Sequence, residues 1–159
     1  MSRIDFYIDT VCDDITSFDS GYAVFNEYLR FSADSAVVHY ILDSESDNLI
    51  AYFSLISSAI IHDDPVKLNA ISAIELKMFA LDKHYQGANL SSVLLDAVIK
   101  TIQHFSNYYV GANVILLYSV PVSHIIQLYE SKGFKKIGDN LTAFRSNFTE
   151  GCIPMYMAL

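Results

Sequence analysis

The chain has 159 residues, of which 18 are acidic and 10 are basic, so its formal net charge at pH 7 is −8. A hydrophobic fraction of 52% with only 18% charged residues excludes an intrinsically disordered chain. The length is that of one domain, and we therefore expect a single domain over residues 1–159.

The acidic residues are concentrated in the first part of the chain. Residues 1–64 contain 12 acidic and 2 basic side chains, whereas residues 65–159 contain 6 acidic and 8 basic ones. A protein that binds DNA or RNA normally carries a basic stripe that neutralises phosphates. The charge therefore argues against a nucleic-acid partner and favours a cationic one, although a surplus of acidic residues also serves solubility alone.

Nothing in the sequence indicates export or insertion into a membrane. The N-terminal residues Met1–Asp5 lack the apolar run of a signal peptide, and no stretch of 18 apolar residues occurs. Cys12 and Cys152 have no redox or metal-binding spacing, and the five histidines lack the spacing of a zinc site. We expect a cytoplasmic protein with free thiols, no metal site and no membrane association.

The first half of the chain is predicted to consist of strands around one helix. The helix is expected to run from a cap at Asp19 or Ser20 to about Phe31. A polar turn at residues 43–48 between two β-rich runs predicts a hairpin. Strands are expected at residues 4–9, 36–42, 49–60 and 70–81.

The second half alternates helices with strands. The clearest helix begins near Asn89, a good N-cap residue, and its apolar residues recur at helical spacing as far as Phe105. Pro121 suits the first turn of another helix, which Gly133 ends. Strands are expected at residues 113–120, 134–137 and 152–159. This order predicts an α/β protein with a mixed, mostly antiparallel twisted sheet of six or seven strands flanked by helices.

The segment between Ile74 and Leu95 carries the clearest indication of function. A predicted strand continues through the loop Gln86–Ser91 into the N-terminus of the clearest helix. Backbone N–H groups of such a loop and the helix dipole both favour a bound anion. The loop matches neither a Walker A motif nor a dinucleotide-binding fingerprint. The sequence therefore predicts an anion site of another kind.

The loop Gln86–Ser91 resembles the pyrophosphate loop of the GNAT superfamily of N-acetyltransferases, whose form is Gln/Arg-x-x-Gly-x-Gly/Ala. Asn89 and Ser91 replace its last two small residues. Asn tolerates a positive φ better than most residues, and Ser permits close approach. The segment Leu128–Phe134 resembles a second signature of this superfamily, Phe/Leu-Tyr-x-x-x-Gly-Phe, and Ile153–Met157 resembles its last strand.

The resemblance covers nearly the whole chain. It implies the GNAT fold and the transfer of an acetyl group from acetyl-CoA directly to a primary amine. The pantetheine arm of the cofactor would pair with the strand before the loop, and the pyrophosphate would rest on N–H groups of the loop. The residues expected to bind the cofactor are Met78, Phe79, Ala80, Leu81, Gln86, Gly87, Ala88, Asn89, Leu90 and Ser91.

Two residues are candidates for catalysis. The resemblance implies that Tyr129 protonates the departing thiolate of coenzyme A, although a tyrosine here also serves to anchor its helix. Glu75 lies 11 positions before Gln86, where some members of the superfamily have a general base. Apolar neighbours would raise the pKa of Glu75, which suits a base, but alternation can equally turn it to solvent beside Lys77.

Residues 18–29 resemble the opening helix of acetyltransferase toxins from toxin–antitoxin pairs, which acetylate the amino acid on charged tRNA. Those toxins typically continue with basic residues, whereas residues 31–36 contain none. We therefore expect a small or peptidic cationic amine as the acceptor. A toxin-like enzyme acting on aminoacyl-tRNA and a catalytically inactive acyl-CoA-binding module are the alternatives. The C-terminal strands offer an edge for a homodimer, and the sequence leaves this point open.

Overall fold

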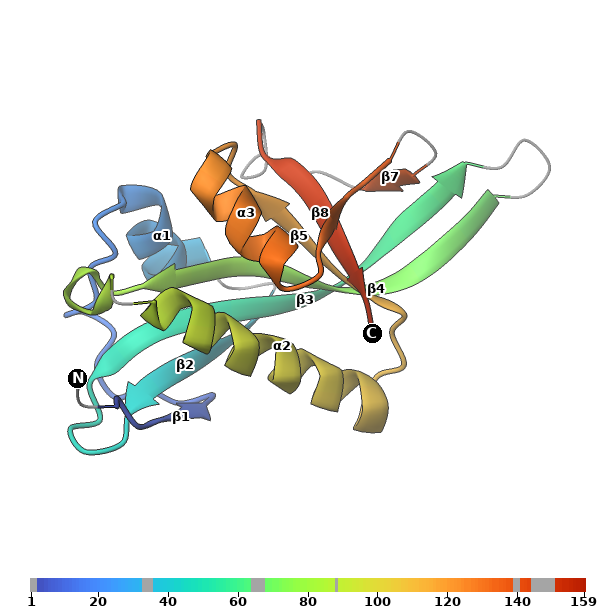
Figure 1. Ribbon diagram of the computed structural model, residues 1–159. Coiled ribbons are helices and arrows are strands. Elements are labelled where there is room, and N and C mark those ends of the chain that lie inside the picture. Colours follow the sequence, from blue (N-terminus) through green and yellow to red (C-terminus); the bar gives the residue numbers. More distant parts are fainter. Residues whose placement is uncertain (1–2, 33–35, 64–67, 88, 139–140, 144–150) are drawn as a thin grey trace. The chain divides into compact units, whose positions relative to one another are not determined.

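The computed structural model describes residues 3–32, 36–63, 68–87, 89–138, 141–143 and 151–159. Within this part of the chain the strands form one sheet of eight, in the order β1-β2-β3-β4-β5-β8-β6, with β7 paired to β3 (Figure 1). The β4–β5 pair is parallel, and the other pairs with a described register are antiparallel. No helix among the described residues is both long and apolar enough to cross a membrane.

The chain divides into two compact units, the first formed by residues 1–56 and 77–93 and the second by residues 57–76 and 94–159. Two long strands, β3 (Leu49–Asp63) and β4 (Leu68–Leu81), contribute residues to both units. The prediction of a single domain stays a prediction. Besides parts of β3 and β4, the first unit contains β1 (Phe6–Asp9), α1 (Ala23–Glu27), the π-helical turn η1 (Tyr28–Ser32), β2 (Val37–Asp43) and the 3-10 helix η3 (Lys83–Tyr85).

The predicted hairpin at residues 43–48 is confirmed. β2 and β3 pair antiparallel on either side of this turn. One carboxylate oxygen of Asp43 accepts hydrogen bonds from the N–H groups of Glu45 and Ser46, both at 2.9 Å. Asp47 has a φ of 57°, a left-handed conformation that Asp tolerates better than most residues. Local side-chain hydrogen bonds thus close the turn in the way that Asx residues favour.

Aromatic side chains form the core of the first unit. The rings of Phe18 and Tyr28 both pack on Tyr52, with centroid distances of 5.3 and 6.3 Å. The Tyr28 hydroxyl hydrogen-bonds to Ser54 Oγ at 3.0 Å, and the Tyr52 hydroxyl donates to the carbonyl oxygen of Phe25 at 2.7 Å. These hydrogen bonds satisfy phenol groups that would be costly to bury without partners. They also attach α1 to β3.

The first helix begins later than predicted. The sequence suggested a cap at Asp19 or Ser20, but the residue that precedes α1 is Tyr22, which makes no side-chain capping bond. The reason is that the side chains of Asp19 and Ser20 are engaged elsewhere, both with the side chain of Asn26. The predicted helix end near Phe31 is correct in position, although the last turn is π-helical.

The second unit is built around β5 (Val114–Ser119), whose residues from Val114 to Leu117 are buried. It pairs in parallel with Ala73–Leu76 of β4 and in antiparallel with all of β8. Because consecutive residues of a strand point to opposite faces, this burial means that both faces of β5 are covered, which explains its continuous apolar run. The other elements of this unit are most of α2 (Leu90–Tyr108), α3 (Ser123–Ser131), β6 (Lys135–Lys136), β7 (Leu141–Ala143) and β8 (Ile153–Ala158).

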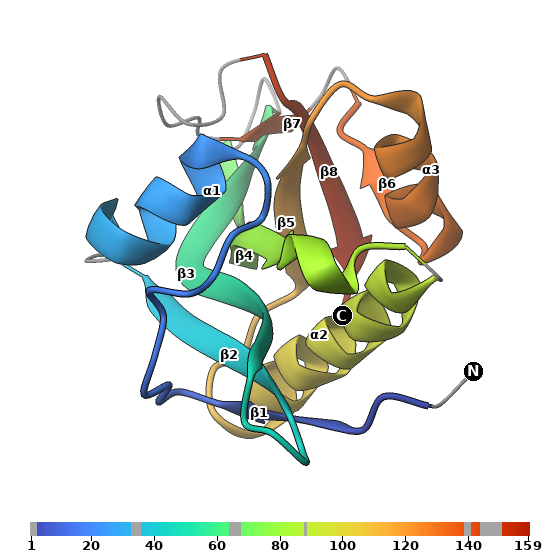
Figure 2. The same ribbon diagram turned by 90° about the vertical axis from the view of Figure 1, so that its left-hand side faces the viewer.

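Gly133 ends α3, as predicted. Its φ is 104°, its N–H donates to the carbonyl oxygen of Glu130, and the Phe134 N–H donates to that of Tyr129. A glycine suits this position because side chains disfavour a left-handed backbone. The chain then turns into β6, which lies beside β8 (Figure 2). The sequence did not predict β7, which has three residues and brings the sheet to eight strands rather than six or seven.

Candidate active site

The predicted anion loop lies between β4 and α2, in the first unit. Gly87 has a φ of 101° and Asn89 a φ of 60°, so both residues have left-handed backbones, as expected for Asn89 from its residue type. Ala88 lies outside the described residues. The N–H groups of Ser92 and Val93 donate to the carbonyl oxygen of Asn89. The N–H groups of a first helical turn otherwise point outwards and are the donors that an anion uses.

Asn89 does not have the backbone of an ordinary N-cap, which the sequence suggested. An N-cap residue is typically extended, whereas Asn89 is left-handed. Leu90 begins the helix, and its N–H donates to the carbonyl oxygen of Gly87 at 3.2 Å. Leu90 and Ser91 are half-buried, whereas Gln86, Gly87 and Asn89 are exposed. The loop therefore presents its backbone to solvent at the N-terminus of α2.

The end of β4, where the resemblance predicts the pantetheine arm, consists mostly of buried residues. Met78, Ala80 and Leu81 are buried, with exposed fractions of 8%, 6% and 8%, while Phe79 is half-buried. The parallel register with β5 covers Ala73–Leu76, and β4 continues beyond it to Leu81. Residues 77–81 therefore lie outside the described pairing with β5.

Glu75 lies in the paired part of β4, opposite Leu116 of β5, and belongs to the second unit. Its side chain is half-buried, as is that of Lys77, while Ile74 and Leu76 on either side are buried. The alternation therefore places Glu75 on the less buried face of β4. Its role as a general base stays a prediction.

Tyr129 lies in α3, in the second unit, and is half-buried. Its ring packs edge-on against Phe134 with a centroid distance of 5.8 Å. Burial raises the pKa of Tyr129 to about 12, because the phenolate form loses hydration. No described residue hydrogen-bonds to its hydroxyl group. The phenol is therefore protonated at neutral pH, as a proton donor must be.

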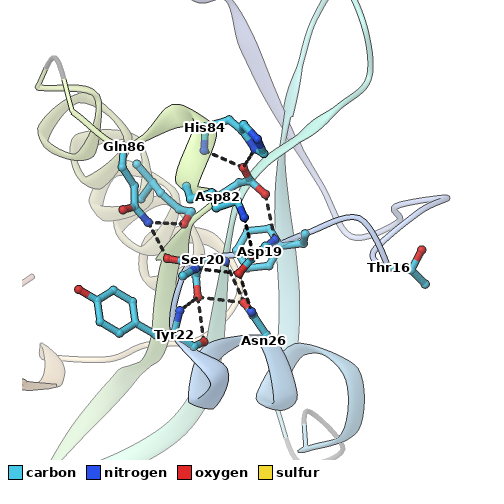
Figure 3. A network of polar contacts seen from close by, with 12 residues as sticks. Thr16, Asp19, Ser20, Tyr22, Asn26, Asp82, His84 and Gln86 are labelled. Carbon is cyan, nitrogen blue, oxygen red and sulfur yellow. Dashed lines mark hydrogen bonds and ion pairs between the residues drawn. The ribbon is translucent and has the colours of Figure 1, made fainter.

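A network of polar contacts joins the end of β4 to the segment before α1 (Figure 3). The Asp82 carboxylate, 5% exposed as a residue, accepts hydrogen bonds from the backbone N–H of Asp19 and from the backbone N–H of His84, both at 2.9 Å. The ring Nδ1 of His84 lies 2.7 Å from the same carboxylate. Burial alone would raise the pKa of Asp82, but these hydrogen bonds outweigh it and hold the pKa below its usual value.

The same network contains an exposed ion pair. Lys83 Nζ lies 2.7 Å from an oxygen of Asp19, whose other oxygen accepts from the N–H of Gly21 and from the amide of Asn26. The bond from Lys83 is the main cause of a strongly lowered pKa at Asp19, followed by the bonds from Gly21 and Asn26. The same contact with Asp19 raises the pKa of Lys83.

The side chain of Gln86, the first residue of the predicted loop, belongs to this network. Its amide nitrogen donates to the carbonyl oxygens of Ser20 and Leu81, at 2.8 and 3.1 Å. The sequence did not reveal these contacts, because Ser20 and Gln86 are 66 positions apart and neither residue type signals a partner. The structure thus brings together the strand end, the loop and the network within the first unit.

The described part of the chain contains no group of three or more His, Cys, Asp or Glu residues placed to hold a metal ion.

No model of a protein family matches the sequence, and no curated protein matches it. Solved structures are similar over nearly the whole length. A bacterial toxin has a TM-score of 0.75 at 16% identity, covering 98% of this chain and 92% of that one. AtaT complexed with acetyl-methionyl-tRNAfMet has a TM-score of 0.67 at 18% identity, covering 92% of this chain and 98% of that one.

A third similar structure is a Tyr-to-Phe mutant of the toxin AtaT bound to the C-terminus of the antitoxin AtaR and acetyl-CoA. Its TM-score is 0.71 at 16% identity, covering 97% of this chain and 93% of that one. Similarity of this extent at such low identity shows a shared fold. The chain therefore has the GNAT fold of these acetyltransferase toxins, as its sequence motifs implied.

Proposed function

We propose that the protein is an acetyl-CoA-dependent N-acetyltransferase of the toxin type, which acetylates the amino group of an aminoacyl-tRNA. The observation that carries this proposal is the near-full-length similarity to AtaT, which has been solved with acetyl-CoA and with acetyl-methionyl-tRNAfMet. These comparisons give no support to the expectation that a nucleic-acid partner is absent. The charged tRNA therefore replaces the small cationic amine as our first choice of acceptor.

The small or peptidic cationic amine is kept as a second candidate acceptor. The observation in its favour is the charge of residues 1–64, which contain 12 acidic and only 2 basic side chains. A surface of this sign attracts ammonium groups and repels phosphates at low ionic strength. Added salt should therefore weaken the binding of a cationic amine, whereas it should reduce the repulsion of a tRNA.

The cofactor site of the proposed enzyme lies in the first unit. The pantetheine arm would lie along the backbone of Met78–Leu81, beyond the part of β4 that is in register with β5. The pyrophosphate would accept hydrogen bonds from N–H groups of the loop Gln86–Ser91, where Gly87 and Asn89 allow the backbone to turn. The reactive thioester is supplied by acetyl-CoA, and the protein supplies orientation and proton transfer.

The proposed reaction is a direct transfer. The acceptor begins as an ammonium group and gives one proton to Glu75 or to a water molecule, and the free amine attacks the thioester carbonyl. A C–N bond forms, the C–S bond breaks, and the second amine proton is lost to solvent. Tyr129 then donates its phenolic proton to the departing sulfur, which leaves as the free thiol of coenzyme A, and the phenolate regains a proton from solvent. These roles rest on the motifs that contain the two residues.

The deciding experiment offers the purified protein acetyl-CoA together with one acceptor at a time. We expect coenzyme A release and an acetylated amino acid with aminoacyl-tRNA, and neither with the same tRNA after deacylation. Polyamines and lysine-containing peptides are the matched alternative acceptors. Activity confined to these amines would support the second candidate and overturn the first. Binding of acetyl-CoA without turnover on any acceptor would indicate an inactive acyl-CoA-binding module.

A test in cells adds an independent readout. Expression of an enzyme that acetylates aminoacyl-tRNA should arrest growth, because it removes substrate from translation. Expression of the Tyr129→Phe variant should arrest growth much less. Equal growth inhibition by both proteins would point to a cause other than acetyl transfer.

A further inference from the structure

The side chain of Gln86, a residue expected to bind the cofactor, makes its hydrogen bonds to the protein itself. Its amide nitrogen has two hydrogens, and it makes one bond to the carbonyl oxygen of Ser20 and one to that of Leu81. A nitrogen with both hydrogens engaged has none left for a pyrophosphate oxygen. The side chain instead joins the first residue of the loop to the segment before α1, as Figure 3 shows.

Further contacts hold the same two segments together. The Asp82 carboxylate accepts the N–H of Asp19 at 2.9 Å, and the Lys83 N–H donates to the carbonyl oxygen of Asp19 at 2.8 Å. The ion pair between Lys83 and Asp19 adds a contact at the surface, where it contributes little on its own. Asp19 and Ser20 are thus bonded to the chain on both sides of η3.

Asp19 and Ser20 are in turn hydrogen-bonded to α1. Asn26, which lies in α1, accepts hydrogen bonds from the N–H and the hydroxyl of Ser20 at 2.9 Å and donates to Asp19. Two carbonyls of the same stretch, those of Thr16 and Phe18, accept from the guanidinium of Arg30 in η1, both at 3.2 Å. Gln86 therefore begins a continuous chain of hydrogen bonds that ends on the first helix.

We infer that Gln86 is a positioning residue that couples the cofactor loop to α1, so that binding of acetyl-CoA at the loop stabilises the segment from Asp19 to Asn26. This inference rests on the proposed function, which identifies the ligand of the loop. Coupling between two segments is reciprocal, so an ordered segment also strengthens binding at the loop. Gln86 acts through its own side chain on the protein, while the loop backbone contacts the pyrophosphate.

The test measures amide hydrogen exchange of peptides that cover residues 18–32, with and without acetyl-CoA. We expect acetyl-CoA to slow exchange there in the unaltered protein and to have little effect on the same peptides in Gln86→Met. This variant keeps the length of the side chain but has no donor. Its KM for acetyl-CoA should rise by roughly tenfold, since two hydrogen bonds are lost, while kcat at saturating acetyl-CoA changes much less.

Two further variants make the result specific. Gln86→Arg keeps hydrogen-bond donors and should restore both the protection and the KM. Gln103→Met makes the same change at an exposed position of α2 and should behave like the unaltered protein.

Because Gln86→Met could fail to fold, Gln86→Glu provides a second route. At neutral pH its carboxylate can only accept hydrogen bonds, so acetyl-CoA should fail to protect residues 18–32 in this variant as well.

The outcomes separate the inference from the proposed function. If the unaltered protein does not bind acetyl-CoA, the proposed function is wrong and the inference fails with it. If it binds acetyl-CoA but Gln86→Met keeps the ligand-induced protection of residues 18–32 and the original KM, the inference alone is wrong. A similar loss of protection in Gln103→Met would also overturn it.

Discussion

The buried carboxylate of Asp82 accepts a hydrogen bond from the backbone N–H of Asp19, 63 positions earlier in the chain, at 2.9 Å. This contact joins the end of β4 to the segment before α1, and it depends on a negative charge. Hydrogen bonds to a charged partner are stronger than neutral ones. The arrangement of the first unit around the predicted cofactor loop is therefore expected to depend on pH.

We predict that stability falls steeply below about pH 4. The pKa values of Asp19 and Asp82 are both lower in the folded protein than the ordinary value of 3.8. Their contribution is therefore present above pH 3.8 and is lost as the pH falls through the lower folded values. Urea midpoints measured between pH 7 and pH 3 should show this loss.

The Asp82→Asn variant provides the matched comparison. It should be less stable by about 2 kcal/mol at pH 7, because hydrogen bonds to a buried charge are weakened, and its stability should depend less on acid. Asp13→Asn, at an exposed position, serves as the control and should leave the midpoints unchanged. An acid dependence in Asp82→Asn equal to that of the unaltered protein would contradict the assignment.

We predict that Asn89→Gly keeps both stability and affinity for acetyl-CoA, whereas Asn89→Val loses stability. Asn89 has a φ of 60°, which glycine adopts freely and which a β-branched residue strongly disfavours. The difference between the two variants should be at least about 1 kcal/mol. Thermal unfolding and titration with acetyl-CoA measure the two quantities. Equal melting temperatures for both variants would show that the backbone here relaxes easily.

Local patterns in the sequence predicted those parts of the fold that depend on neighbouring residues. The turn after Asp43, the glycine at the end of α3 and the left-handed Asn89 all follow from what single residue types tolerate. The apolar run of β5 also predicted a buried strand, because consecutive apolar residues place hydrophobic side chains on both faces. The motifs around Gln86 and Tyr129 then indicated the GNAT fold, which the comparison with solved structures confirms.

Contacts between distant segments could not be predicted in this way. Asp19 and Ser20 are residue types that often cap helices, but here they bond to Asn26 and to the segment after β4, so α1 begins later. The Gln86 amide also has its partners outside its own motif. A strand of three residues such as β7 is too short to show a period. In each case the deciding partner comes from tertiary structure.

We predict that Tyr52→Phe destabilises the protein by about 1 kcal/mol, because the hydrogen bond from β3 to α1 is lost. Tyr52 is fully buried, and its hydroxyl donates to Phe25 in α1 at 2.7 Å. Thermal unfolding should show a decrease of several degrees for a chain of this size. Tyr108→Phe is the control, since Tyr108 is 73% exposed. A decrease of the same size in both variants would mean that the hydrogen bond contributes nothing.

We predict that Glu75→Gln lowers kcat/KM at neutral pH and that the loss becomes smaller as the pH rises. A general base is needed only while the acceptor is an ammonium ion, and alkaline solution removes that proton without help. The measurement is a pH profile of coenzyme A release for both proteins with the same acceptor. A loss that is constant across the profile would instead point to a role of Glu75 in β4, between buried neighbours.

Tyr129→Phe is the most direct test of the proposed chemistry. The substitution keeps the ring, which packs on Phe134 with a centroid distance of 5.8 Å, and removes only the hydroxyl. We expect kcat to fall by roughly 10²- to 10⁴-fold, the usual contribution of a general acid, with little change in the KM for acetyl-CoA. Tyr109→Phe, at a position that is 74% exposed, is the control and should keep full activity.

The pH profile adds a second criterion. Since the pKa of Tyr129 is raised to about 12, its proton is present throughout the range in which the protein can be assayed. The kcat of the unaltered protein should therefore show no alkaline decrease that Tyr129→Phe abolishes. A decrease near neutral pH that disappears in Tyr129→Phe would mean that the phenol titrates in a less buried setting. A kcat unchanged by the substitution would assign the proton of the departing sulfur to solvent.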